Sequence, residues 1–84
     1  MEKIYNRIKL LRIERDISRQ DLAQRVQVNP QTIGFLEREQ YNPSLSLAFK
    51  IAAVFGLSVH HIFSAKPFKS LFASNQDIPK EINV

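Results

Sequence analysis

The sequence predicts an all-α domain, a compact bundle of five helices followed by a short C-terminal tail. Apolar residues between positions 1 and 65 recur three or four positions apart, which is the period of a helix with one buried face. Serine, asparagine, proline and glycine stand where such helices would begin or end. No part of this region resembles a pair of strands. We therefore expect a helical domain over residues 1–65 and a separate tail over residues 66–84.

Size and composition limit what the chain can be. Its 84 residues suffice for one small domain, and the absence of cysteine excludes disulfides and thiolate metal sites. The formal net charge of +4 suits a polyanionic partner such as nucleic acid. No apolar run reaches the roughly 20 residues of a membrane helix, and the N-terminus lacks the apolar stretch of a signal peptide. We expect a cytoplasmic protein without membrane contact.

The first predicted helix runs from about residue 4 to residue 15. Ile4, Ile8 and Leu11 would share one face of it, because they are spaced four and then three positions apart. This face would be buried against the rest of the bundle.

Two short helices and the turn between them are the most informative part of the sequence. Ser18 is a favourable N-cap for a helix that ends near Gln27. Asn29 and Pro30 suit the cap and the first position of the next helix, which would span residues 30–38. Two helices joined by a turn of about three residues have the geometry of a helix-turn-helix. The outward residues of the second helix would be Gln31, Gly34, Phe35 and Arg38.

Two further helices complete the expected domain. The fourth begins near Ser44 and stops at Gly56. Its apolar residues are Leu45, Leu47, Ala48, Ile51, Ala52 and Phe55. Ser58 would cap a short fifth helix. The tail contains two prolines and is compatible with a short helix and an extended end, or with a strand.

These elements together resemble the phage-repressor/Cro-like (XRE) family of helix-turn-helix regulators. The residues that carry the resemblance are Asn6-Arg7-Ile8-Lys9, Ser18-Arg19-Gln20-Asp21-Leu22-Ala23, Val28-Asn29-Pro30-Gln31-Thr32-Ile33, Leu36-Glu37-Arg38, Tyr41-Asn42-Pro43-Ser44-Leu45, Phe49-Lys50-Ile51-Ala52 and Val54-Phe55-Gly56-Leu57-Ser58. The resemblance implies a lambda-repressor-like domain of five helices whose third helix enters the major groove of double-stranded DNA. It also implies a transcriptional regulator, which we expect to be a repressor.

The positions that the family uses for DNA can be carried over to this chain. The implied DNA-binding residues are Arg19, Gln20, Asn29, Gln31, Thr32, Phe35, Arg38, Gln40, Tyr41 and Asn42. Gln31 would read a base, because its amide can pair with adenine in a bidentate manner. Phe35 stands where the family often has a polar residue and could pack on a thymine methyl group. Arg19 replaces the usual Gln at a phosphate-contacting position.

Two other features of the resemblance concern structure. Arg12 and Glu37 match a pair that usually forms a partly buried salt bridge between the first and third helices. Gln27 and Glu39 stand where the family usually has Gly. If they keep the left-handed backbone, the strain is roughly 1 kcal/mol each. Glu39 would also place a negative charge near the expected path of the phosphates.

Family members usually act as dimers, because one helix in the groove reads too few base pairs for strong specificity. The residues expected at a homodimer interface are Val59, Ile62, Phe63, Phe68 and Leu71. Neither a metal nor another cofactor is expected, since the adjacent His60 and His61 point apart on a helix and lack further ligands nearby. The sequence has no glycine-rich phosphate loop and no paired carboxylates, so we do not expect an enzyme.

The main alternative is a protein-interaction module, such as an antitoxin or an adaptor. Leu10 and Ile13 would neighbour each other on the outer surface of the first helix. They are either scattered exposed apolar residues, which are common, or a docking patch for the tail through Phe68, Leu71 or Phe72. We favour the docking interpretation. A partner protein could bind to the same surface.

Overall fold

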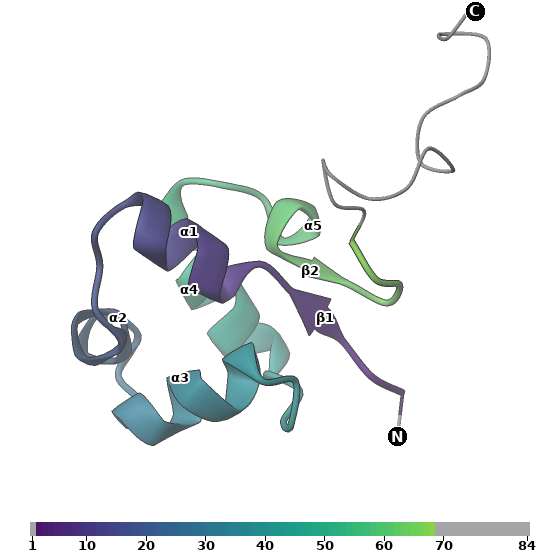
Figure 1. Cartoon of the computed structure of the whole chain (residues 1–84), viewed down its shortest axis with the longest axis horizontal. Helices are drawn as coiled ribbons and strands as arrows, with labels where there is room; N and C mark the ends of the chain where they lie inside the picture. The colour runs from purple at the N-terminus through teal and green to yellow at the C-terminus, as the bar shows by residue number, and fades with distance from the viewer. Residues whose placement is uncertain (1, 69–84) are drawn as a thin grey trace, which may run out of the picture.

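The computed structural model describes residues 2–68. The predicted five helices are present, and two very short strands accompany them (Figure 1). In chain order the elements are β1 (Tyr5–Asn6), α1 (Ile8–Glu14), α2 (Arg19–Val26), α3 (Pro30–Glu37), α4 (Leu45–Phe55), α5 (Val59–Ile62) and β2 (Phe63–Ser64). The described part of the chain contains no helix long and apolar enough to cross a membrane.

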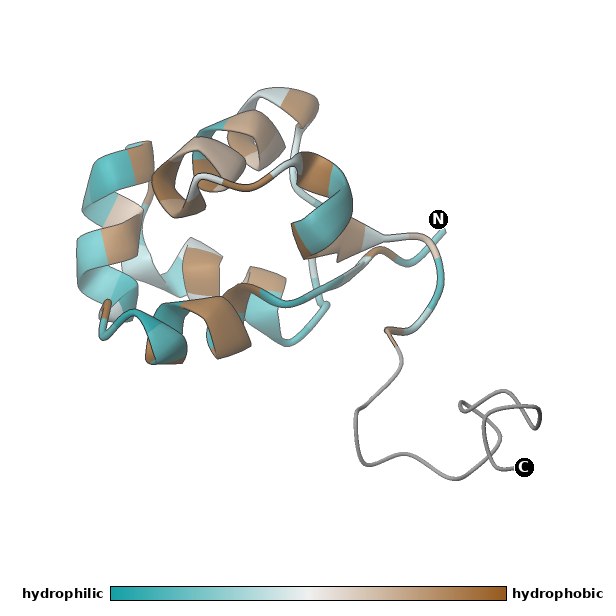
Figure 2. Ribbon diagram, turned by 90° about the horizontal axis from the view of Figure 1, so that it is seen from above, coloured by the Kyte–Doolittle hydropathy of each residue, from teal (hydrophilic) through white to brown (hydrophobic). Residues whose placement is uncertain are grey.

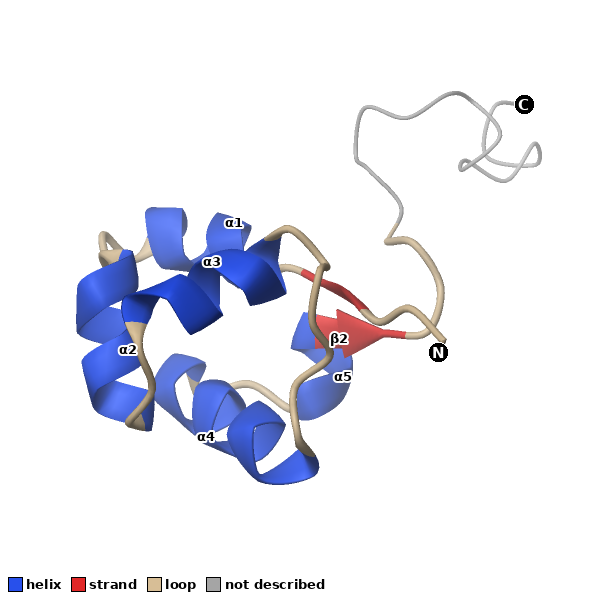
Figure 3. Ribbon diagram, turned by 90° about the horizontal axis from the view of Figure 1, so that it is seen from below, coloured by secondary structure: helices blue, strands red, loops and turns tan. Residues whose placement is uncertain are grey.

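The start of the chain differs from the prediction, which had a helix from residue 4 and no strands. Residues 5 and 6 pair antiparallel with residues 64 and 63, beside α5 (Figure 3). Asn6 ends this pairing and starts α1, because its side-chain oxygen accepts a hydrogen bond from the Ile8 amide at 3.0 Å. Its side-chain nitrogen donates to the carbonyl oxygen of Leu36 at 2.7 Å. Two-residue strands are too short to show an alternating pattern, and their partner lies far along the chain.

A single hydrophobic core holds the helices together. Every helix contributes side chains to it, and α4 is apolar along most of its length, whereas α2 and α3 mix apolar and polar residues (Figure 2). The fully buried side chains of largest volume are Ile8, Leu22, Ile33, Leu36, Ile51, Ile62 and Val26. Leu45, one of the apolar residues of the predicted fourth helix, opens α4 and is 70% exposed.

The helix starts follow the predicted signals. The hydroxyl of Ser18 accepts a hydrogen bond from the Asp21 amide at 2.9 Å, and that of Ser44 accepts from the Leu47 amide at 3.1 Å. Asn29 has the extended N-cap backbone, with Pro30 as the first residue of α3, but its side chain makes no capping bond. Ser58 begins α5, and its hydroxyl bonds to the His61 ring instead.

Left-handed residues end several helices. Gly56 follows α4 with a φ of 66°, as its lack of a side chain allows. Gln27 after α2 has a φ of 63°, and Glu39 after α3 has a φ of 61°. Both residues therefore keep the conformation for which the family uses glycine, which strains a residue that carries a Cβ.

Replacing Gln27 by glycine should stabilise the fold. Relief of the left-handed strain should raise the free energy of unfolding by about 0.5–1 kcal/mol, after the greater chain entropy of glycine is deducted. The matched control is Gln24→Gly, an exposed position inside α2, which should lower it by about 0.7 kcal/mol. Urea unfolding of the two variants measures both changes. If both variants changed the free energy of unfolding in the same direction, the assignment of left-handed strain to Gln27 would be contradicted.

Candidate nucleic-acid interface

The α2–turn–α3 unit forms a helix-turn-helix, as the sequence predicts. In the turn, the Val28 amide donates a hydrogen bond to the carbonyl of Ala23 at 2.9 Å. This bond ends α2 just before α3 begins. Ala23 is 1% exposed, and its small side chain lies in the core that α2 and α3 share. Val28 is half-buried against this core. Packing therefore fixes α3 relative to α2.

The two faces of α3 differ sharply. Its inner face carries Ile33 and Leu36, both fully buried. Gln31 and Phe35 lie one turn apart on the opposite, exposed face, with the half-buried Thr32 between them. Helical spacing thus presents one amide and one aromatic ring side by side to the solvent.

Gly34 is buried, which corrects the prediction that it belongs to the outer face. A Cβ at this position would lie 3.3 Å from a terminal nitrogen of Arg38, so the arginine side chain folds back over the glycine. The Arg38 guanidinium carbon also lies 5.3 Å from the centre of the Phe35 ring. Arg38 Nε donates to the side-chain oxygen of Gln40 at 3.2 Å. A cation is thereby held at the C-terminal end of the exposed face of α3.

A second cationic group lies at the start of α2. Glu37, whose side chain is 2% exposed, accepts from Arg12 Nε at 2.7 Å and from Arg19 Nε at 2.9 Å. Arg12 is itself largely enclosed and also donates to the Ile17 carbonyl at 3.0 Å. Arg19 remains 46% exposed. The structure thus places Arg12 and Glu37 together as the resemblance implies, and adds Arg19 to the pair.

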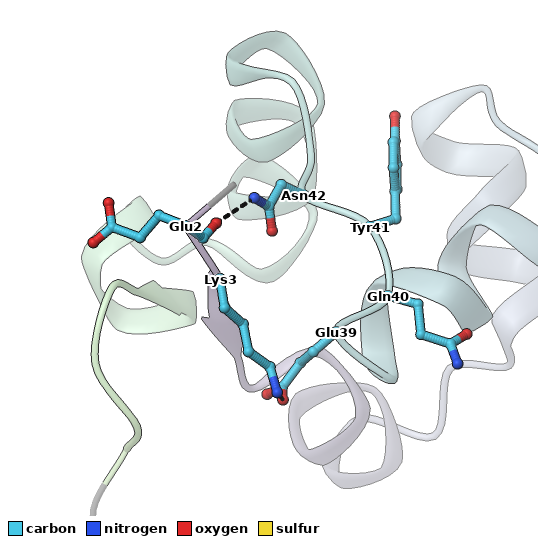
Figure 4. A pocket seen from close by; sticks show the side chains of 6 residues that line it. All are labelled: Glu2, Lys3, Glu39, Gln40, Tyr41 and Asn42. Carbon is cyan, nitrogen blue, oxygen red and sulfur yellow. Dashed lines mark hydrogen bonds and ion pairs between the residues drawn. The ribbon is translucent and has the colours of Figure 1, made fainter.

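Residues 2–4 form an N-terminal arm that contacts the loop after α3, and sequence analysis did not predict this contact. Asn42 donates to the Glu2 carbonyl at 2.7 Å and accepts from the Ile4 amide at 3.3 Å (Figure 4). Lys3 pairs with Glu39 at 3.3 Å. The negative charge of Glu39 near the expected phosphate path is therefore offset within the chain. Because the two partners lie about 40 positions apart, no local pattern could have revealed this contact.

The remaining predicted DNA-binding residues are accessible. Gln20, Asn29, Gln40 and Tyr41 are exposed, and Asn42 is half-buried with its amide engaged by the arm. These residues lie at the start of α2, at the start and on the outer face of α3, and in the loop after it. The bond between Arg19 and Glu37 joins the start of α2 to the end of α3. Contact of each residue with DNA stays a prediction.

The predicted dimer interface needs correction at two positions. Ile62 is fully buried and Phe63 is 8% exposed, because α5 and β2 direct them into the core of the single chain. Val59 is half-buried. Phe68 is also half-buried, and its ring centre lies 4.1 Å from the guanidinium carbon of Arg7. Leu71 lies outside the described residues.

The histidines and acidic residues of residues 2–68 form no group of three or more that could hold a metal ion. His61 bonds to Ser58 at 2.7 Å, and its neighbour His60 is exposed.

Fold and exposed surface together define a helix-turn-helix nucleic-acid-binding domain. Residues 8–62 match the helix-turn-helix family model HTH_3, and the chain belongs to this family of phage-repressor/Cro-like (XRE) regulators.

Curated relatives agree with this assignment, and a solved structure shares the fold. An uncharacterized HTH-type transcriptional regulator of Archaeoglobus fulgidus is 49% identical over 57 residues, which are 68% of this chain and 80% of the relative. Another from Methanocaldococcus jannaschii is 43% identical over 58 residues, 69% of this chain and 88% of the relative. The crystal structure of a protein from Bacteroides fragilis, described as a putative DNA-binding protein, shares the fold with a TM-score of 0.66 at 23% identity, covering 73% of this chain and 98% of that one.

Removing the enclosed arginine should cost far more than removing an exposed one. Arg12→Ala leaves the buried Glu37 with Arg19 as its remaining partner, so we expect a loss of about 3 kcal/mol in the free energy of unfolding. The control is Arg25→Ala, which breaks an exposed i,i+4 pair with Asp21 and should cost about 0.5 kcal/mol at most. Urea unfolding measures the loss in the free energy of unfolding for each of the two variants. Similar losses for both variants would refute a structural role for Arg12.

Proposed function

We propose that this protein is a sequence-specific transcriptional regulator that binds double-stranded DNA with α3 in the major groove. The observation that supports this most is the exposed face of α3 with two accessible cations near its C-terminal end, Arg19 and Arg38. The acidic residues close to this face are offset, because Glu37 is buried between two arginines and Glu39 is paired with Lys3. The face can therefore approach phosphates without repulsion.

The proposed contacts divide by chemistry. Arg19 at the start of α2, together with Gln40 in the loop after α3, would bind the phosphate backbone and orient the domain. Gln31 would read adenine through a bidentate pair. Similarity to proteins named as HTH-type transcriptional regulators supports the same role.

We further propose that the protein acts as a homodimer and represses transcription by occupying its site. Two α3 helices about 34 Å apart would read two half-sites one helical turn apart on a palindromic operator. Val59 and Phe68 are the described members of the expected interface that keep exposed surface. A measured molecular mass of one chain on an operator-length duplex would contradict the dimer.

Binding to DNA from the upstream region of its own gene, titrated at several salt concentrations, tests the main proposal. Site-specific binding with a steep fall in affinity as salt rises is expected, since bound cations are released from the phosphates. Weak binding of equal strength to all sequences would contradict a sequence-specific regulator.

Gln31→Ala should weaken recognition of the base and leave the backbone contacts intact. We expect a loss of about 1–3 kcal/mol in discrimination between the operator and unrelated DNA. The salt dependence should stay unchanged, because no charge is removed. Gln24→Ala, at an exposed position of α2, is the control and should retain discrimination. Competition binding measures both, and equal discrimination by wild type and Gln31→Ala would exclude base reading by Gln31.

A second candidate function is protein interaction, as in an antitoxin or adaptor. The observation that favours it is the exposure of Leu10 and Ile13 on α1, at 59% and 60%. Replacing both by serine should abolish capture of a protein partner without altering affinity for DNA, because both residues lie on α1, outside the α2–turn–α3 unit.

A further inference from the structure

We infer that the rings of Phe35 and Tyr41 form the apolar part of a surface pocket that receives the C5-methyl group of a thymine in the operator. This inference rests on the proposed function and names what one part of the same surface recognises. It goes further in assigning a pair of aromatic residues, one on α3 and one in the loop after it, to a single feature of a base.

The pocket is a cavity of about 370 Å³ lined by Thr32, Phe35, Gln40 and Tyr41. Both aromatic side chains are 46% exposed, and they lie together at the mouth of this one cavity. The Tyr41 ring stands away from the loop and from the N-terminal arm, so the arm does not cover it (Figure 4). A patch of this kind on a nucleic-acid-binding face indicates a contact with the ligand.

The pocket is held in place before any ligand arrives. Arg38 stacks on Phe35 and bonds to Gln40, which lies between the two aromatic residues in the chain. The backbone amide of Gln40 also donates to the Phe35 carbonyl at 2.9 Å, which follows from the left-handed backbone of Glu39. This bond ties the loop that carries Tyr41 to the residue that carries the other ring. Binding therefore needs little further ordering of these side chains.

The chemistry of the pocket favours thymine among the four bases. In the major groove thymine alone presents a methyl group, whereas the other bases are distinguished there by hydrogen-bond donors and acceptors. The Phe35 ring has neither a donor nor an acceptor. It can gain free energy from a methyl group by removing apolar surface from water. Gln31, one turn earlier on α3, is left to supply the hydrogen bonds to a neighbouring base.

Replacing single thymines by deoxyuridine tests this inference, because the exchange deletes only the methyl group. The operator is the site recovered from a random duplex library with the wild-type protein. We expect deoxyuridine to lower affinity about three- to fivefold at one position in each half-site, the effect of one buried methyl group. Deoxyuridine at other thymines should have no effect. Equal affinity at every substituted position would overturn the inference and leave the proposed function standing.

Variants assign the effect to the pocket. Phe35→Ala should abolish the sensitivity to deoxyuridine, while Phe49→Ala should keep it. Phe49 is the matched control, because it is 59% exposed on α4 and does not line the pocket. Sensitivity that persists in Phe35→Ala would overturn the inference. A library selection that recovers no preferred site would overturn the proposed function and this inference together.

Discussion

The arrangement of the first three helices depends on one buried carboxylate. Glu37 is the last residue of α3, and its side chain is 2% exposed. An ionised carboxylate in such a place is costly unless it is paired and hydrogen-bonded. Arg12 from α1 and Arg19 from the start of α2 both donate to it, so each of the three helices contributes a charge to one cluster. A misplaced helix would leave a charge buried without its partner, which favours this single arrangement.

The cluster of Arg12, Arg19 and Glu37 also orients one basic side chain on the exposed surface. Arg19 Nε donates to the buried Glu37 carboxylate, which orients the arginine side chain. This side chain is still 46% exposed and remains accessible to a ligand. Glu39 lies beyond the end of α3 and is offset by Lys3 of the arm. Both acidic residues at the end of α3 are thus used to position basic ones. The net charge of +4 alone indicates none of this, because it does not show where the charges lie.

The sequence was sufficient for the features that local chemistry determines. The caps at Ser18 and Ser44, the stop at Gly56 and the helix-turn-helix all follow from signals within a few residues. The failures involve contacts between distant segments. The β1–β2 pairing, the contact of Asn42 with the arm and the burial of Gly34 under Arg38 depend on how the chain returns on itself. Ile62 and Phe63, expected at a dimer interface by analogy with the family, lie in the core instead, because apolar residues suit either environment and only packing distinguishes the two.

The end of α3 shows why a strained residue can be retained. Glu39 keeps a φ of 61° where glycine would fit more easily. Glycine would remove the strain, but it would also remove the carboxylate that binds Lys3 and secures the arm beside the loop. The left-handed turn directs Gln40 back to the Phe35 carbonyl, and Tyr41 follows next to the exposed ring. The left-handed backbone at residue 39 therefore sets the spacing between α3 and the loop after it, while the Glu39 carboxylate adds the link to the arm that glycine could not supply.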